Sequence, residues 1–198
     1  LARLQFSTLS LDLTRFQPCP DANRKKELRQ NFGLPAEAVV WSFVGSGFDR
    51  KGLLWAIQIA AALRSQGVWL LVLGHGNRRR YLQAAVALGY EDRVCFAPEG
   101  TNSADVYHAS DAFILPTIYD PCSNAALEAA ACGLPVITTQ ANGAVEWAPG
   151  ITLADPTLTA ECAERCKLYA RPLQIAQDAL GQIRARLPVV AVAPLSSP

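Results

Sequence analysis

The sequence predicts an α/β domain with an open, doubly wound and mainly parallel sheet that carries helices on both faces. Three observations favour this fold. Short apolar runs recur along the chain, and they are continuously apolar rather than alternating, which is typical of strands buried on both faces. Helical segments separate these runs, as in parallel βαβ units. The 198 residues, 51% of them hydrophobic, are enough for one such domain.

The elements follow one another in a regular order from residue 39 onward. Most of the apolar runs end at a glycine or a proline, and most of the helical runs end at or shortly before a glycine. We expect strands at residues 39–44, 68–73, 93–97, 112–115, 135–138 and 150–153. We expect helices at residues 24–31, 53–63, 79–88, 104–109, 124–132 and 159–186, the first capped by Asp21 and the last broken at Pro172.

The two ends of the sequence differ from this pattern. Residues 1–20 have no clear period and close with two prolines, so we assign them to an extension or interdomain linker. Residues 21–186 form the folded domain. Residues 187–198 are rich in Pro and Ser, which predicts a poorly ordered tail. The sequence begins with Leu1 rather than Met, and we therefore expect a piece of a longer or processed chain.

The charge balance excludes one class of partner. The formal net charge is only +1, whereas strongly basic nucleic-acid binders carry a large excess of one sign. We therefore expect no nucleic-acid partner. Arg78, Arg79 and Arg80 form one local basic cluster. We interpret it as the solvated start of a helix, with a contact to anionic lipid or to a phosphorylated acceptor as the alternative.

The six cysteines form no C-x-x-C pair. Cys162 and Cys166 fall on one face of a helix, but no second pair of Cys or His accompanies them, so the pattern predicts no metal site. Cys95 and Cys132 lie in apolar sequence and are interpreted as small buried residues. A reduced, cytoplasmic compartment fits this cysteine pattern best.

The loop after the first strand predicts a diphosphate site. It reads Gly45-Ser46-Gly47-Phe48-Asp49-Arg50-Lys51-Gly52. Glycines let a backbone approach a ligand closely, the next helix offers its N-terminal amides to an anion, and Arg50 and Lys51 add two positive charges. The loop matches neither the Walker sequence nor G-x-G-x-x-G, and an ordinary surface turn is the alternative.

The loop after the second strand carries Gly74 and His75. Gly74 is expected to lie close to a ligand. His75 and His108 are the only two histidines, and a general-base role is one hypothesis for His75. A structural or solvent-exposed histidine is the favoured interpretation of both.

The segment after the fourth strand carries two carboxylates. Asp120 lies in the loop, and Glu128 lies inside the next helix. Ser123 and Asn124 stand at the start of that helix, where they can cap it while its free amides face an anion. Glu128 follows Asn124 by four positions and shares its side of the helix. Its carboxylate can accept hydrogen bonds from two hydroxyls, as a ribose would offer; a structural glutamate is the alternative.

Several segments together resemble one known family. Asp120 and Glu128 are separated by seven residues, as two glutamates are in that family, and Arg50-Lys51-Gly52 follows a Gly-rich turn as its phosphate loop does. Residues 12–18, 131–137 and 142–146 are similar to the family's D-x-x-x-F-x-P, A-x-G-x-P-V-I and G-G-x-x-E segments. The sequence resembles the C-terminal domain of the retaining glycosyltransferases built from two Rossmann-like domains, of the glycosyl transferases group 1 type. Ser123-Asn124 in place of the commoner Gly-Leu resembles the branch with lipopolysaccharide-core glucosyltransferases.

This resemblance implies a role for each loop. Arg50 and Lys51 would stabilise the charge that builds on the leaving nucleotide, and Asp120 would contact the hydroxyls of the donor sugar. Asp120 is one methylene shorter than the family glutamate, so its reach differs. The donor-binding residues implied are Gly45, Ser46, Arg50, Lys51 and Gly74 around the phosphates, Phe96, Ala97 and Pro98 at the base, Asp120, Cys122, Ser123, Asn124 and Ala125 along the sugar and phosphates, and Glu128 at the ribose.

The resemblance also implies the wider function. The domain would bind a nucleotide-sugar donor, with UDP-glucose or a related UDP-sugar as the first candidate, for retaining transfer without a metal or other cofactor. A glycan or lipid-linked acceptor would bind through an N-terminal domain that this sequence lacks, so we expect little or no transfer by these residues alone. Synthesis of lipopolysaccharide or another envelope glycan is the implied pathway, in the cytoplasm or at the inner face of the membrane, with peripheral membrane association of the full-length protein.

The sequence leaves four other interpretations. A sugar-nucleotide epimerase half-domain would need an acid and a base around the sugar carbon. A Rossmann dehydrogenase would need G-x-G-x-x-G and an acidic residue about 20 positions later. A flavodoxin-like receiver would need acidic residues where Gly45-Ser46 stands. A non-catalytic domain that only binds nucleotide or mediates assembly is the fourth.

Overall fold

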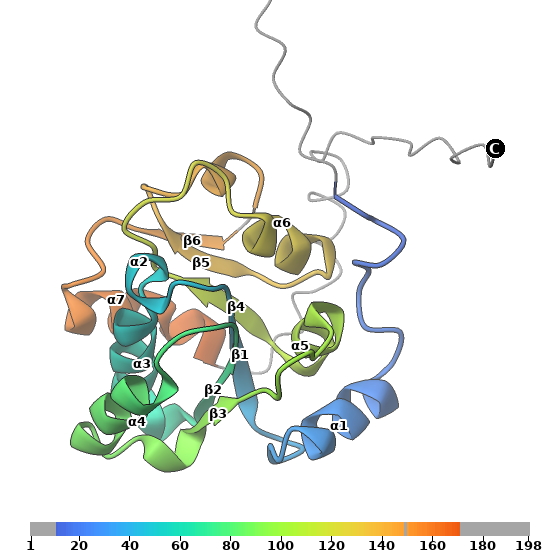
Figure 1. Cartoon of the computed structure of the whole chain (residues 1–198), viewed down its shortest axis with the longest axis horizontal. Helices are drawn as coiled ribbons and strands as arrows, with labels where there is room; N and C mark the ends of the chain where they lie inside the picture. Colours follow the sequence, from blue (N-terminus) through green and yellow to red (C-terminus); the bar gives the residue numbers. More distant parts are fainter. Residues whose placement is uncertain (1–10, 149, 171–198) are drawn as a thin grey trace, which may run out of the picture.

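The computed structural model describes residues 11–148 and 150–170. They form a parallel sheet of six strands in the order β3-β2-β1-β4-β5-β6 (Figure 1). All strand pairs are parallel, which confirms the predicted fold class. The strands are β1 (Val39–Val44), β2 (Val68–Leu73), β3 (Val94–Phe96), β4 (Ala112–Leu115), β5 (Val136–Thr139) and β6 (Gly150–Leu153).

The order of the strands reverses between β1 and β4. From β1 the chain proceeds outward to β2 and β3, and it then returns to the other side of β1 to build β4, β5 and β6. β1 pairs with β2 along its whole length, from Val39 to Val44, whereas its register with β4 holds only two residue pairs. In open parallel sheets ligands bind at such a switch point, outside the carboxyl ends of the strands, and we call this region beside the loops after β1 and β4 the crevice.

Helices cover both faces of the sheet. On one face, α3 (Leu53–Ala62) packs against α4 (Arg78–Ala87) and α7 (Thr159–Cys166). On the other, α1 (Ala22–Asn31) packs against α5 (Ser103–Ala109), as Figure 1 shows. α6 (Asn124–Ala131) connects β4 to β5, and a right-handed crossover puts it on the face of α5. The short turns are α2 (Phe48–Lys51) and the 3₁₀ segments Arg64–Gln66, Glu91–Arg93, Gly143–Glu146 and Lys167–Ala170.

The helix expected at residues 53–63 agrees with α3 but has a short turn before it, and the last expected helix differs from the structure. The helix expected from residue 53 is preceded by α2, and the two are separated because Gly52 takes a left-handed backbone conformation with φ of 81°. The helix expected over residues 159–186 was wrong in its extent, since α7 ends at Cys166 and tightens into a 3₁₀ turn. In that turn the Tyr169 carbonyl accepts a hydrogen bond of 2.9 Å from the Trp41 indole. This bond attaches the turn to β1. Residues 171–186, the expected break at Pro172 and the tail 187–198 lie outside the described residues.

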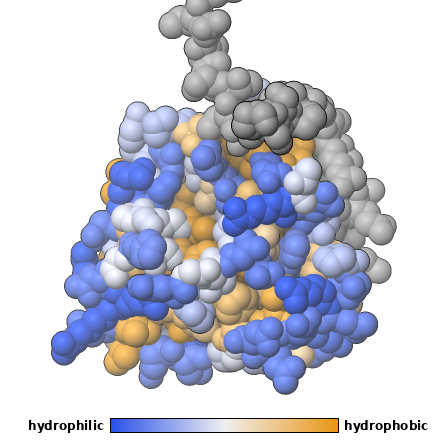
Figure 2. Space-filling model, turned by 45° about the vertical axis from the view of Figure 1, so that its right-hand side comes forward, coloured by the Kyte–Doolittle hydropathy of each residue, from blue (hydrophilic) through white to orange (hydrophobic). Residues whose placement is uncertain are grey.

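The core lies in the sheet and on both of its faces. Every residue of β1, β4 and β5 is buried, and the large side chains of Trp41, Phe43, Phe113 and Ile114 have no exposed surface. On the face turned to the viewer in Figure 2, hydrophilic residues predominate and hydrophobic ones show between them. Continuously apolar strands are therefore matched by burial on both faces, as the sequence indicated.

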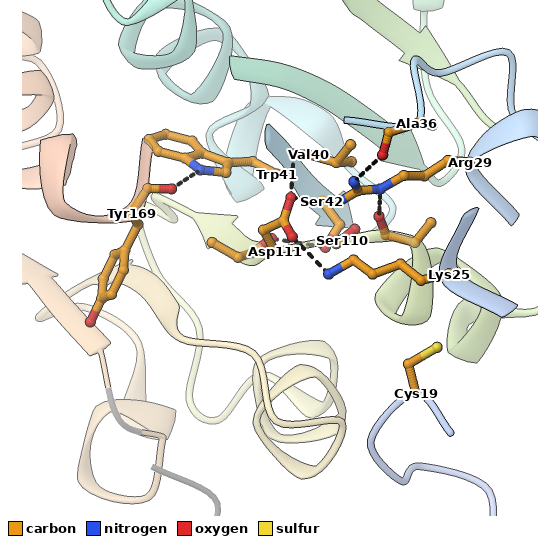
Figure 3. Close-up of polar contacts among 12 residues, drawn as sticks. Cys19, Lys25, Arg29, Ala36, Val40, Trp41, Ser42, Ser110, Asp111 and Tyr169 are labelled. Atoms are coloured by element: carbon orange, nitrogen blue, oxygen red, sulfur yellow. Dashed lines mark hydrogen bonds and ion pairs between the residues drawn. The ribbon is translucent and has the colours of Figure 1, made fainter. Parts of the chain in front are cut away.

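Asp111 anchors α1 to the amino ends of two strands. It stands directly before β4, and its carboxylate accepts hydrogen bonds from Lys25 Nζ at 2.7 Å, Arg29 Nη2 at 2.6 Å and the Val40 amide at 2.8 Å (Figure 3). Arg29 also donates to the Ala109 carbonyl at 2.9 Å. The Arg29 and Asp111 side chains are only 7% and 11% exposed, so each charge depends on the other for compensation.

We expect Asp111→Ala to lower the free energy of unfolding by about 3 kcal/mol, because it leaves the Arg29 charge buried without its partner. The matched control is Asp92→Ala, which removes the same group from an exposed pair with Arg64 and should change stability little. Urea unfolding followed by circular dichroism measures both. Equal losses for the two variants would contradict the anchoring role of Asp111.

Candidate functional site

The loops after β1 and β4 are joined to each other by hydrogen bonds to backbone groups. The Arg50 carbonyl accepts hydrogen bonds from the Ile118 amide at 3.0 Å and from Thr117 Oγ1 at 2.9 Å. Arg50 Nη1 donates to the Tyr119 carbonyl at 2.8 Å. Gly52 lies so close to the second loop that a Cβ atom there would stand 2.1 Å from the Pro116 carbonyl oxygen. Only glycine allows this approach.

The loop after β2 lies equally close to the loop after β1. A Cβ atom on Gly74 would stand 2.0 Å from the Gly45 carbonyl oxygen. The Gly47 amide donates to the His75 carbonyl at 3.3 Å, and the His75 amide donates to Ser46 Oγ at 3.4 Å. The His75 side chain is exposed. The structure thus brings Gly45, Ser46 and Gly74 together; their expected approach to a ligand stays a prediction.

Lys51 and Asp120 form an ion pair inside the crevice. Lys51 Nζ donates to Asp120 Oδ2, and the two side chains are 13% and 8% exposed. Arg50, the other predicted cation, is exposed. Of the three residues expected to be catalytic, Lys51 and Asp120 are therefore paired with each other in the structure, and Arg50 is not part of this pair.

α6 directs its N-terminus toward the same crevice. Ser123 is the N-cap, and its Oγ accepts the Ala126 amide at 3.4 Å. The Ser123 amide donates to Asn142 Oδ1 at 3.2 Å. The amides of Asn124 and Ala125, in the first turn, have no intrahelical acceptor. This end of the helix can therefore donate hydrogen bonds to an anion.

Glu128 lies one helical turn further along α6. Its Oε2 accepts a hydrogen bond of 2.8 Å from the hydroxyl of Tyr107 on α5. Within the described part of the chain Oε1 accepts no hydrogen bond, which leaves that oxygen for a ligand. Burial raises the pKa of the Glu128 carboxyl, opposed by the Tyr107 hydrogen bond and by the charge of Arg15. Burial and the Glu128 charge together raise the pKa of Tyr107 well above its ordinary value.

A cavity of about 270 Å³ lies at the carboxyl ends of β1, β2 and β3. Arg78 flanks it: its Nη2 donates to the Ala97 carbonyl at 3.3 Å, and its guanidinium lies over the Phe96 ring, 5.6 Å from the centroid. The basic cluster does start a helix, since Arg78 is the first residue of α4 and Arg79 and Arg80 are exposed, but Arg78 itself is half-buried against the ring and the carbonyl rather than fully solvated. The lining residues are Val44, Gly45, Ser46, Leu73, Gly74, His75, Arg78, Glu99, Gly100 and Thr101.

The residues expected at the base occupy different environments. Ala97 is fully buried, Phe96 is half-buried and Pro98 is exposed. The cavity is lined instead by the next residues, Glu99 to Thr101. Neither these residues nor Arg78 were predicted from the sequence, although Arg78 directly follows the second glycine loop and could have been placed by that position.

Two other side chains singled out in the sequence are Cys122, in the loop after β4, and His108, on α5. Cys122 is half-buried, and burial together with the charges of Asp120 and Glu146 raises the pKa of its thiol. His108 bonds through Nε2 to the Gln17 carbonyl at 2.8 Å, which fits a structural role.

In residues 11–148 and 150–170 no three His, Cys, Asp or Glu side chains are grouped as metal ligands. Within the same residues no helix has the length and apolar character needed to span a bilayer.

Comparison with known proteins decides the family. A model of the family described as glycosyl transferases group 1 matches residues 38–170. The chain belongs to the glycosyl transferases group 1 family. The match includes the loops after β1, β2, β3 and β4, and so covers the whole crevice.

Curated relatives include enzymes of different pathways. The lipopolysaccharide core biosynthesis glycosyltransferase LpsD of Rhizobium meliloti is 29% identical over 168 residues, which are 84% of this chain and 46% of LpsD. The 2-deoxystreptamine glucosyltransferase of Streptomyces kanamyceticus is 32% identical over 166 residues, 81% of this chain and 43% of that enzyme. The chain therefore spans about half the length of the curated relatives it matches.

Solved structures show the same fold. The C-terminal domain of the group 1 family protein LpcC from Francisella tularensis is similar with a TM-score of 0.73 and 18% identity, over 91% of this chain and 100% of that domain. WaaG, a glycosyltransferase involved in lipopolysaccharide biosynthesis, has a TM-score of 0.74 at 24% identity, over 85% of this chain and 50% of WaaG. The fold is that of a Rossmann-like domain of such glycosyltransferases. The similarity fits an assignment of this chain to their C-terminal domain.

Gly52 and Gly67 have the same backbone conformation but different surroundings, so substitutions at the two positions distinguish backbone strain from a steric clash. Gly52 has φ of 81° and lies against the Pro116 carbonyl, whereas Gly67 has φ of 82° and nothing within 4 Å of its Cβ position. We expect Gly67→Ala to cost about 1–2 kcal/mol of stability through strain alone. Gly52→Ala should cost about 1–3 kcal/mol more, because it pushes the two loops apart. Urea unfolding measures both, and similar losses would contradict the tight contact at Gly52.

The raised pKa of Glu128 predicts a pH-dependent stability. A carboxyl whose pKa is higher in the folded state favours folding when protonated, so its contribution is present below its ordinary pKa and is lost as the pH rises through the folded value. We expect Glu128→Gln, which can still accept from Tyr107, to be more stable than the wild type at pH 7. The difference should vanish at pH 4. Glu161→Gln, at an exposed position on α7, is the control, and a pH-independent gain at Glu128 would refute the burial effect.

Proposed function

We propose that this chain is the donor-binding half of a glycosyltransferase, with a nucleotide-sugar held in the crevice between the loops after β1 and β4. The observation that carries the proposal is that, in a domain of this family, Lys51 pairs with Asp120 in the loop after β4, which leads directly into the N-terminus of α6 and, one turn later, to Glu128. Each provides a group that a nucleoside diphosphate requires. Family membership favours this function over an epimerase or a purely structural nucleotide-binding domain.

The diphosphate would lie between the first loop and the start of α6. Lys51 and Arg50 provide positive charge there, and the free amides at Asn124 and Ala125 provide hydrogen-bond donors. When the bond to the sugar breaks, negative charge accumulates on the leaving nucleoside diphosphate. Fixed cations and amides at that position lower the energy of this step without a metal. We therefore propose transfer that requires no metal or other cofactor.

The ribose would lie at Glu128. Tyr107 holds Oε2 and orients the carboxylate, and Oε1 can accept from the ribose hydroxyls. The base would then occupy the cavity beside Arg78, Glu99 and Thr101. Cys122 and Ser123 would line the sugar and the phosphates, largely through their backbone.

The donor is proposed to be a UDP-sugar, with UDP-glucose first. HepE from Anabaena, solved in complex with UDP-glucose, has a similar fold with a TM-score of 0.70 at 23% identity, over 91% of this chain and 52% of HepE. The Streptomyces relative is named as a glucosyltransferase. Retention of the anomeric configuration is proposed from the family resemblance of the acidic pair, Asp120 and Glu128.

The acceptor would bind outside this domain. The chain covers only about half of WaaG and of HepE, and we propose that a further, N-terminal domain completes the cleft and holds a glycan or lipid-linked acceptor. LpsD and LpsE of Rhizobium meliloti are named for lipopolysaccharide core biosynthesis. We propose the same class of envelope glycan for this chain, made in the cytoplasm at the inner face of the membrane.

Calorimetric titration of the chain with UDP, GDP, ADP and NAD, in EDTA and in Mg²⁺, tests this function. We expect UDP to bind equally well in both solutions. Arg50→Ala and Glu128→Gln should each weaken binding by about 10-fold, the loss typical of one charge-assisted hydrogen bond. Lys26→Ala, at an exposed cation on α1, is the matched control. Preference for NAD, dependence on Mg²⁺, or an equal loss in Lys26→Ala would contradict the proposal.

A further inference from the structure

The backbone of Asp120 is fixed on both sides. Its amide donates to the Ala141 carbonyl at 3.0 Å, and its carbonyl accepts from the Gly143 amide at 3.0 Å. Asp120 thereby forms an isolated parallel bridge with Asn142. A Cβ atom on Gly143 would stand 1.9 Å from the Pro121 carbonyl oxygen, so the loop after β5 lies directly against this segment. The short Asp120 side chain therefore starts from a well-defined point.

Lys51 reaches this carboxylate from the other side of the crevice. Its stem passes over Gly45, where a Cβ atom would lie 3.5 Å from Lys51 Cγ. Its ammonium then donates to Asp120 Oδ2. The pair links the loop after β1 to the loop after β4 at the place where the strand order reverses. Both side chains are nearly buried, so neither can swing into solvent without losing its partner.

We infer that Asp120 is a positioning residue for Lys51, and that it affects donor binding through this lysine even when the donor carries no sugar. This inference rests on the proposed function of the crevice. An ammonium has three donors, and only one is used by Asp120, so the others remain for a phosphate oxygen. A flexible lysine that is held in advance loses less conformational entropy when the diphosphate arrives.

Two rival roles lead to different results. If Asp120 only contacts the sugar, removing its charge should weaken a nucleotide-sugar and leave the free nucleoside diphosphate unaffected. If Asp120 competes with the diphosphate for Lys51, removing its charge should strengthen the binding of both. Positioning predicts that both ligands weaken by the same factor.

The test is a double-mutant cycle on the intact chain, with UDP and UDP-glucose as separate ligands in calorimetry. The variants are Asp120→Asn, Lys51→Met and the pair together, with Asp120→Glu as the variant that keeps the charge. We expect Asp120→Asn to weaken both ligands by about 10-fold, and the double variant to bind no more weakly than Lys51→Met alone, because coupled residues are not additive. Asp120→Glu should lose less than Asp120→Asn, since the longer acid can still meet the flexible lysine.

Other outcomes of the titrations would contradict either the inference or the proposed function. Additive losses in the cycle, a loss confined to UDP-glucose, or tighter binding by Asp120→Asn would overturn the inference while the donor-site proposal stands. A wild-type chain that binds neither ligand would contradict the proposed function itself, and the inference with it. Thermal unfolding of every variant separates loss of binding from loss of fold.

Discussion

The reversal of strand order between β1 and β4 is the constraint on which the rest of the site depends. Parallel strands carry their carboxyl ends to one edge of the sheet, and a reversal makes the loops after two neighbouring strands leave in opposite directions. Specific contacts hold the two loops in place beside the crevice. Here these are the approach of Gly52 to Pro116, the Arg50 contacts with the Thr117–Tyr119 segment, and the Lys51–Asp120 pair. They give the crevice its shape and its charge together.

The carboxylates at the amino ends and at the carboxyl ends of the strands have different surroundings. At the amino edge, Asp111 is surrounded by Lys25, Arg29 and the Val40 amide, and its charge is fully compensated. At the carboxyl edge, Glu128 is half-buried with one oxygen unbonded among the described residues, and burial raises the pKa of its carboxyl. Groups held in such partly satisfied environments are typical of binding sites, where the ligand completes the set of contacts.

Much of the fold could be predicted from the sequence because its signals are local. The strands at residues 39–44, 68–73 and 112–115 agree with the structure in their bounds, since each is an apolar run that ends at Gly or Pro. The crevice loops were also placed correctly relative to the strands. In contrast, the Lys51–Asp120 pair and the Asp111 network join residues about 70 or more positions apart, and no local pattern indicates them. The contacts of Arg78 were not predicted either, because its partners are on another element, at Phe96 on β3 and Ala97 directly after it.

A structure of the chain with a bound nucleoside diphosphate is the sharpest test of this binding mode. We predict phosphate oxygens within hydrogen-bonding distance of Lys51 Nζ and of the amides of Asn124 and Ala125, with the ribose hydroxyls on Glu128 and no metal ion at the phosphates. A nucleotide bound with its phosphates at another place, or held there only through a metal ion, would contradict it.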